Sequence, residues 1–237
     1  MRSALLLTRL PLPCLIGPAC AFARRLAAWL CSLAAATALV TGAAAFDSLR
    51  LQRAADRLGP RAVAAVVPLE QMLAQAAALD EEGQLAAVNG FFNRRIVFRE
   101  DIQAWGQADH WASPLEALDK GYGDCEDYAI AKYFSLVALG VPVQRLRLVY
   151  VRAQVGSDSQ AHMVLAYYAQ PGAEPQILDN LVTSVRPASR RPDLTPVFSF
   201  NGEGLWQGVG TQSAGDPQAR LSRWREVLAK ARAEGFF

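Results

Sequence analysis

The stretch GYGDCEDYAIAKYFSLVALG, Gly121 to Gly140, decides the fold of this chain. After its polar start, the apolar residues recur with the spacing of one helix face: Ala129, Ile130, Tyr133, Phe134, Val137 and Ala138. Gly140 is typical of a helix end, and Pro142 prevents continuation. Asp124 is the predicted N-cap, with Asp127 three residues later in a capping-box-like arrangement. The predicted helix therefore begins at Cys125.

Cys125 stands between two acids, Asp124 and Glu126, and Asp127 follows directly. Neighbouring carboxylates raise the pKa of a thiol. The unpaired N–H groups and the positive end of a helix dipole lower it. The helix N-terminus can therefore supply the stabilisation of a thiolate that the acids oppose.

The first 45 residues contain four arginines and no acid. Leu26 to Val40 is apolar, and the small residues Thr41 to Ala45 follow. This pattern predicts a secretory signal over residues 1–45, cleaved after Ala45, and a single exported domain over residues 46–237. The alternative is a retained membrane anchor, for which the apolar run is short.

Cleavage would change both the charge and the cysteine content. Losing four arginines and no acids takes the formal net charge from +2 to −2, which removes the basic charge that supports nucleic-acid binding. Cys125 would be the one cysteine left, without a disulfide partner in an oxidising compartment. It is therefore a candidate nucleophile. The alternative, an inert buried thiol, fits poorly with three adjacent acids.

The rest of the chain predicts helices followed by strands. Helices are expected over 64–78, interrupted at Pro68, over 80–93, from Pro114, and within 216–235. A loop is expected before Pro114, and strands are expected over 145–153, 162–169 and 176–182. The tail before the closing helix is expected to form loops, with room for one more strand. Short, turn-rich connections favour an antiparallel meander. The predicted fold class is α+β, with the cysteine helix packed on an antiparallel sheet.

A thiolate nucleophile needs a base, and the chain has two histidines. His162 is predicted to begin a strand, from which it could reach the helix N-terminus, although a surface histidine would look the same. His110, in a loop between tryptophans, is either a wall of the site or exposed.

The residue that orients the base is predicted in QILDNLV. Asp179 is an acid within an apolar strand, so it needs a buried partner such as His162. Asn180 is the neighbouring candidate, which strand alternation would turn to the other face. The Cys125 N–H is the expected oxyanion donor, with a second donor left open between Trp105 and Gln107.

Four segments carry a resemblance to a known family: GDCEDYAIAKYFSL, QAHMVLAYY, ILDNL and RPDLTPVFSFN. They resemble the bacterial transglutaminase-like cysteine proteases of the LapG type, which have a papain-like/transglutaminase-like fold. The resemblance runs from about Phe91 to Trp206. It implies a catalytic triad of Cys125, His162 and Asp179. It also implies a Ca²⁺ site formed by acids that flank the cysteine, here Asp124, Glu126 and Asp127.

The resemblance further implies a role in the periplasm. Proteases of this type cleave the N-terminal region of a large surface adhesin at a di-alanine-type site, which releases the adhesin and promotes biofilm dispersal. An inner-membrane cyclic-di-GMP receptor sequesters them through contacts that include an exposed tryptophan, assigned here to Trp105. We expect a monomer that does not bind nucleic acid.

Three other functions stay open from the sequence. A transglutaminase-like triad can transfer the acyl group to an amine instead of water. The fold could be a non-catalytic module that binds calcium for structure. A cell-wall amidase or peptidase would also suit an exported thiol enzyme. A zinc enzyme is disfavoured, because one cysteine and two distant histidines lack the spacing of zinc ligands.

Overall fold

The computed structural model of the chain describes residues 46–237. The predicted signal over residues 1–45, and its alternative as a membrane anchor, lie outside this range. Within 46–237, no helix combines the length and the apolar character that a membrane crossing requires.

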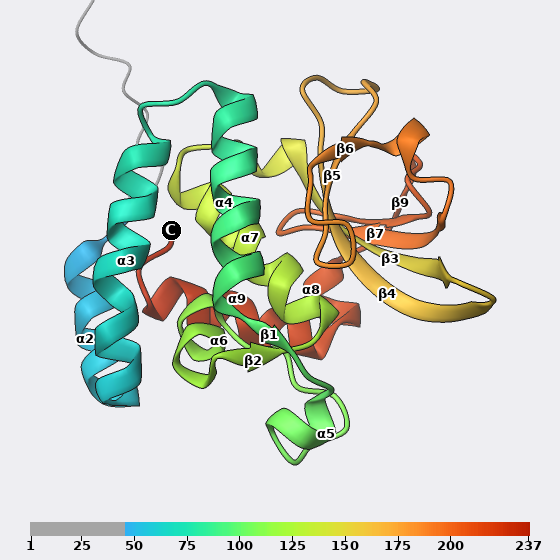
Figure 1. The fold of residues 1–237 in the computed structure, drawn as a ribbon. Helices are drawn as coiled ribbons and strands as arrows, with labels where there is room; N and C mark the ends of the chain where they lie inside the picture. Colours follow the sequence, from blue (N-terminus) through green and yellow to red (C-terminus); the bar gives the residue numbers. More distant parts are fainter. Residues whose placement is uncertain (1–45) are drawn as a thin grey trace, which may run out of the picture. The chain divides into compact units, whose positions relative to one another are not determined.

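Helices form the first half of the described chain and its C-terminal end (Figure 1). The first half contains α2 (Ser48–Leu58), α3 (Pro60–Ala76), α4 (Glu81–Arg95), α5 (Asp101–Ala104), α6 (Pro114–Lys120) and α7 (Cys125–Ala138), and the end contains α8 (Pro217–Arg220) and α9 (Ser222–Ala233). Pro68 lies inside α3 and does not interrupt it, contrary to the prediction. The buried side chains of α3, such as Leu69 and Met72, hold the helix in the core and offset the missing hydrogen bond.

The strands form an antiparallel sheet with the order β6-β5-β4-β3-β7-β8-β9. Its members are β3 (Leu146–Val155), β4 (Asp158–Tyr167), β5 (Gln176–Leu178), β6 (Arg186–Pro187), β7 (Leu194–Phe200), β8 (Leu205–Gln207) and β9 (Ser213–Gly215). Short 3-10 turns, η2 (Val143–Arg145) and η3 (Ala188–Arg190), precede β3 and β7. A separate parallel ribbon joins β1 (Val97–Phe98) to β2 (Tyr122–Gly123). The α+β class and the antiparallel meander are confirmed.

Helix α7 is the centre of the molecule. It packs on β3 and β4 on one side and against α4 and α6 on the other (Figure 1). Every residue from Asp127 to Leu136 is therefore buried, including Lys132, rather than one face alone. Gly140 ends the helix in the left-handed conformation, at φ 87°, as its position predicted. Its N–H donates to the Val137 carbonyl, and the Val141 N–H donates to the Leu136 carbonyl.

Two strand boundaries differ from the prediction and change how the site is built. The β3–β4 connection is a two-residue turn, because Gly156 takes φ 62° and allows a tight hairpin. β4 therefore begins at Asp158, and His162 lies inside the strand opposite Val151 rather than at its start. β5 ends at Leu178, so Asp179 follows the strand instead of lying within it. The strand-alternation argument against Asn180 therefore does not apply.

Candidate active site

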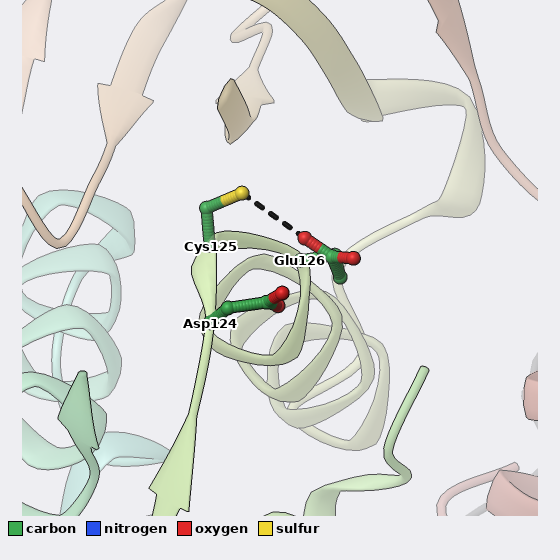
Figure 2. A group of neighbouring side chains, drawn as sticks. All are labelled: Asp124, Cys125 and Glu126. Carbon is green, nitrogen blue, oxygen red and sulfur yellow. Dashed lines mark hydrogen bonds between the residues drawn. The ribbon is translucent and has the colours of Figure 1, made fainter. Parts of the chain in front are cut away.

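The β2 strand leads directly into α7 and places Cys125 at the first residue of the helix. Figure 2 shows the Cys125 and Glu126 side chains on the same side of the helix start. The thiol Sγ donates to Glu126 Oε2 at 3.0 Å. Asp124 is the N-cap residue, as predicted, but its side chain accepts no hydrogen bond from the helix. The Asp127 carboxylate instead accepts from the Ala112 N–H at 2.7 Å, so the predicted capping box is wrong.

The surroundings of Cys125 favour the protonated thiol. Burial raises the pKa of the Cys125 thiol, and the charge and hydrogen bond of Glu126 raise it further. The backbone N–H of Met163 acts in the opposite direction, which places the sulfur beside β4, next to His162 in sequence. Burial and the neighbouring acids therefore oppose the thiolate, and positive charge close to the sulfur would favour it.

His162 and Asp179 meet in the protein interior. His162 Nε2 lies 2.8 Å from Asp179 Oδ1, and both side chains are almost completely buried. This contact uses Nε2, so Nδ1 is the nitrogen left for a reacting group. Asp179 Oδ1 also accepts from the N–H groups of Asn180 and Leu181, which hold the carboxylate at the end of β5. The structure thus joins His162 to Asp179 and not to Asn180.

Sequence reasoning missed the other partner of Asp179. Arg191 Nη2 donates to Asp179 Oδ2 at 2.7 Å, and this guanidinium is also buried. Burial pushes the pKa of Asp179 up, but the His162 and Arg191 contacts outweigh it and bring the pKa to about 2. Arg191 comes directly before PDL, in a segment that carried the resemblance, yet nothing in its local pattern indicates a buried side chain.

Lys132 was also missed. It lies seven residues after Cys125 on α7, is completely buried, and its Nζ has no hydrogen-bond partner among residues 46–237. Burial lowers the pKa of Lys132 to about 7, while the nearby Asp179 charge opposes this shift. Its Nζ lies 5.5 Å from the centroid of the Tyr128 ring.

The acids around Cys125 belong to a larger cluster. Carboxylate oxygens of Asp101, Asp124 and Asp127 lie within 4.8 Å of one another, and Glu126 approaches Asp101 and Asp109 within the same limit. Asp101 and Asp109 come from a segment predicted to be a loop, where α5 forms and carries Asp101 into the interior. In the sequence, these two residues are visible only as further acids in a short segment that precedes the cysteine helix.

These carboxylates lack the partners that buried anions need. One oxygen each of Asp101, Asp124 and Asp127 is buried without a hydrogen bond in the described part of the chain. Burial, followed by repulsion from Glu126, raises the pKa of Asp124 to about 10. Burial also raises the pKa of Asp127 well above its usual value and that of Asp101 to about 6. Several unpartnered oxygens converging on one point are the donor set of a hard cation.

Residues 105–110 contain the remaining candidates, Trp105, Gln107 and His110. The Trp105 and His110 rings have centroids 4.1 Å apart and are tilted by 31°, and Lys120 Nζ lies 5.0 Å from the Trp105 ring centre. Trp105 is half-buried, whereas the resemblance implies an exposed tryptophan. His110 is half-buried as well, and its backbone N–H donates to Asp101. Gln107 is exposed, so the two candidates for the second oxyanion donor differ in accessibility.

Comparison with known proteins places this geometry in a family. The model of the bacterial transglutaminase-like cysteine proteinases matches residues 67–193. The solved structure of EGTA-treated LapG from Legionella pneumophila is 36% identical, with a TM-score of 0.69 and coverage of 79% of this chain and 98% of that one. The calcium-bound structure of the same protein is also 36% identical, with a TM-score of 0.68 and coverage of 78% and 98%. None of the curated proteins compared with the chain matches it.

The chain belongs to the bacterial transglutaminase-like cysteine proteinases. The similarity to LapG extends over nearly the whole of that protein, which confirms the predicted family and the transglutaminase-like fold.

Proposed function

We propose that the chain is a calcium-dependent endopeptidase whose triad is Cys125, His162 and Asp179. The observation that carries this proposal is the buried contact of 2.8 Å between His162 Nε2 and Asp179 Oδ1, on a strand that packs against the helix of Cys125. This arrangement leaves Nδ1 of His162 free to exchange a proton with the sulfur, as a cysteine nucleophile requires.

The reaction follows the chemistry of such triads. The Cys125 thiol gives its proton to His162 Nδ1, and the thiolate attacks the carbonyl carbon of the scissile bond. His162 then protonates the leaving amine, and the C–N bond breaks to leave a thioester on Cys125. Water gives a proton to His162, attacks the thioester and releases the second product with the free thiol. Asp179 holds Nε2 throughout and stabilises the imidazolium.

Calcium fits the acid cluster by the chemistry of its donors. The unpartnered oxygens of Asp101, Asp124 and Asp127 are the hard ligands that Ca²⁺ prefers, with Glu126 and Asp109 beside them. When bound, the ion supplies positive charge next to the thiol and offsets the carboxylates that favour its protonated form. The calcium-bound structure of Legionella pneumophila LapG supports this assignment.

The substrate that we propose is the N-terminal region of a large surface adhesin, cleaved at a di-alanine-type site in the periplasm to promote biofilm dispersal. The support is the likeness to LapG across nearly all of that protein. The test incubates the protein with an N-terminal adhesin fragment from the same cell, first with calcium and then with a chelator. Cleavage that needs calcium and is absent in Cys125→Ala supports the proposal.

Other outcomes of the same assay would point elsewhere. Cleavage that survives chelation would keep the triad and remove calcium from the function. If an added amine appears in the product by mass spectrometry, acyl transfer replaces hydrolysis. Cleavage by Cys125→Ala would refute the assignment of Cys125 as the nucleophile. If the protein never cleaves and its thiol never reacts with a thiol-specific probe, the protein is a binding module.

We also propose that a cyclic-di-GMP receptor in the inner membrane sequesters the protein through the surface around Trp105. In the segment that leads to Trp105, the apolar side chains of Val97, Phe98 and Ile102 on β1 and α5 are exposed. Apolar residues exposed together mark interaction sites more often than inert surface. In a pull-down with the receptor's periplasmic domain, Ile102→Glu should lose binding while Leu49→Glu, an equally exposed leucine on α2, keeps it. Equal binding by both variants would exclude this surface.

A further inference from the structure

The Asp179 carboxylate has two sides with different partners. Oδ1 faces His162 and two backbone N–H groups, whereas Oδ2 faces Arg191 alone. The carboxylate is completely buried, and a buried carboxylate without an opposite charge takes up a proton. A protonated Asp179 would no longer stabilise a charged imidazole. Some cation must therefore remain beside it.

His162 cannot be that cation at every stage. In the proposed reaction its imidazole alternates between neutral and charged forms. Lys132 is the second positive group near Asp179, but burial lowers its pKa to about 7, so its charge also varies near neutral pH. The Arg191 guanidinium stays protonated under all these conditions.

Arg191 is itself held in a fixed position. Its Nε and Nη2 donate to the Asp193 carboxylate at 3.0 and 2.7 Å, the fork geometry that arginine forms with carboxylates. The Asp193 side chain is 34% exposed, so the network reaches solvent there. The contacts run in one line from His162 through Asp179 and Arg191 to Asp193. In this line each carboxylate lies next to a basic side chain.

We propose that Arg191 is a positioning residue that acts as the permanent counter-ion of Asp179 and keeps this carboxylate ionised and aimed at His162 in both protonation states of the imidazole. The proposal deepens the proposed function, since it rests on His162 being the base. Lys132 on α7 is a further titratable group near Asp179. It makes no hydrogen bond to Asp179 among the described residues.

The test is a titration followed by NMR in protein labelled with ¹⁵N-histidine, which gives signals from only His110 and His162. In Arg191→Met, loss of the cation should raise the midpoint at which the His162–Asp179 pair releases its proton. The expected shift is at least about one pH unit, a tenfold change in proton affinity. Arg191→Lys should restore most of the wild-type midpoint. Asp193→Asn should shift the midpoint downward, because it removes a negative charge beside Arg191. Arg190→Met, at an exposed neighbouring arginine, should change nothing.

The outcomes separate this proposal from a structural role and from the protease assignment. An Arg191→Met protein with a native His110 signal and an unchanged midpoint would overturn it. If Arg191→Met does not fold, Asp193→Asn decides, and an upward or absent shift there overturns the proposal. With substrate, kcat in Arg191→Met should fall at constant KM, and Arg191→Lys should recover most of the loss. Because the titration needs no substrate, absent cleavage with the predicted midpoints would refute the proteolytic function and leave the role of Arg191 intact.

Discussion

Replacing Asp179 by asparagine keeps the size of the side chain and removes its charge. In the structure Oδ1 accepts from three donors, led by His162 Nε2, and Oδ2 accepts from Arg191. An amide has only one accepting oxygen, so its NH₂ group must face a donor in either orientation. We therefore expect Asp179→Asn to damage stability as well as activity.

The size of the stability loss follows from these contacts. Although burial opposes it, the His162 and Arg191 contacts lower the pKa of Asp179 from 3.8 to about 2. This shift corresponds to about 2 kcal/mol of stability from the ionised carboxylate. A buried donor that faces another donor adds about 1–3 kcal/mol. The free energy of unfolding of Asp179→Asn at pH 7, measured by urea denaturation, should therefore be about 3–5 kcal/mol lower.

The loss should also depend on pH in a defined direction. Because the folded-state pKa lies below the unfolded value, the carboxylate contributes its stability above about pH 4 and loses it as the pH falls through about 2. The gap between wild type and variant should therefore narrow on acidification through this window. A gap that widens there would contradict the network.

Activity is the second assay of the same variant. Loss of the acid that orients a catalytic histidine lowers kcat on the order of 10⁴-fold in triad enzymes. Asn180→Ala is the matched control, because the Asn180 side chain is adjacent to Asp179 but makes no hydrogen bond to His162 in the part of the chain described. This variant should keep its activity. An Asp179→Asn protein with wild-type stability and rate would refute the reasoning, and an inactive Asn180→Ala would move the orienting role to that residue.

Three further predictions concern calcium, a buried amide and a helix end. Calcium at 100 times its Kd should raise the free energy of unfolding by about 2.7 kcal/mol. Calorimetry with and without a chelator should show this gain in the wild type and little of it in Asp101→Asn. Asn201→Ala should lose about 3 kcal/mol in urea denaturation, because its buried side chain bonds the carbonyls of Val143 and Leu146 and the N–H groups of Glu203 and Gly204. Gly140→Ala should cost about 1–2 kcal/mol in the same assay, because φ 87° disfavours a Cβ.

Most of the longer helices and the antiparallel pairing of β3, β4 and β5 could be predicted because their signals are local. The α7 helix begins at Cys125 and ends before Gly140, as the cap residues and the apolar spacing indicated. The closing helix α9 buries Trp224, Val227, Leu228 and Ala231, the face that its spacing predicts. Errors arose where a local signal was ambiguous. The turn-rich residues before His162 predict a connection over residues 154–161, whereas the turn takes only residues 156 and 157 and the next residues pair with β3.

The sequence by itself determined the α+β class, the nucleophile candidate and the family resemblance, because cap residues, periodicity and a long motif are properties of neighbouring residues. Only the tertiary structure decided which charges meet. Arg191 reaches Asp179 from twelve residues away, and Asp101 joins acids more than twenty residues further along the chain. Lys132 is buried because α7 is covered on both sides, which no periodicity within the helix reveals. The strength of an interaction between charges depends on burial and distance, and folding sets both by packing segments that are remote in sequence.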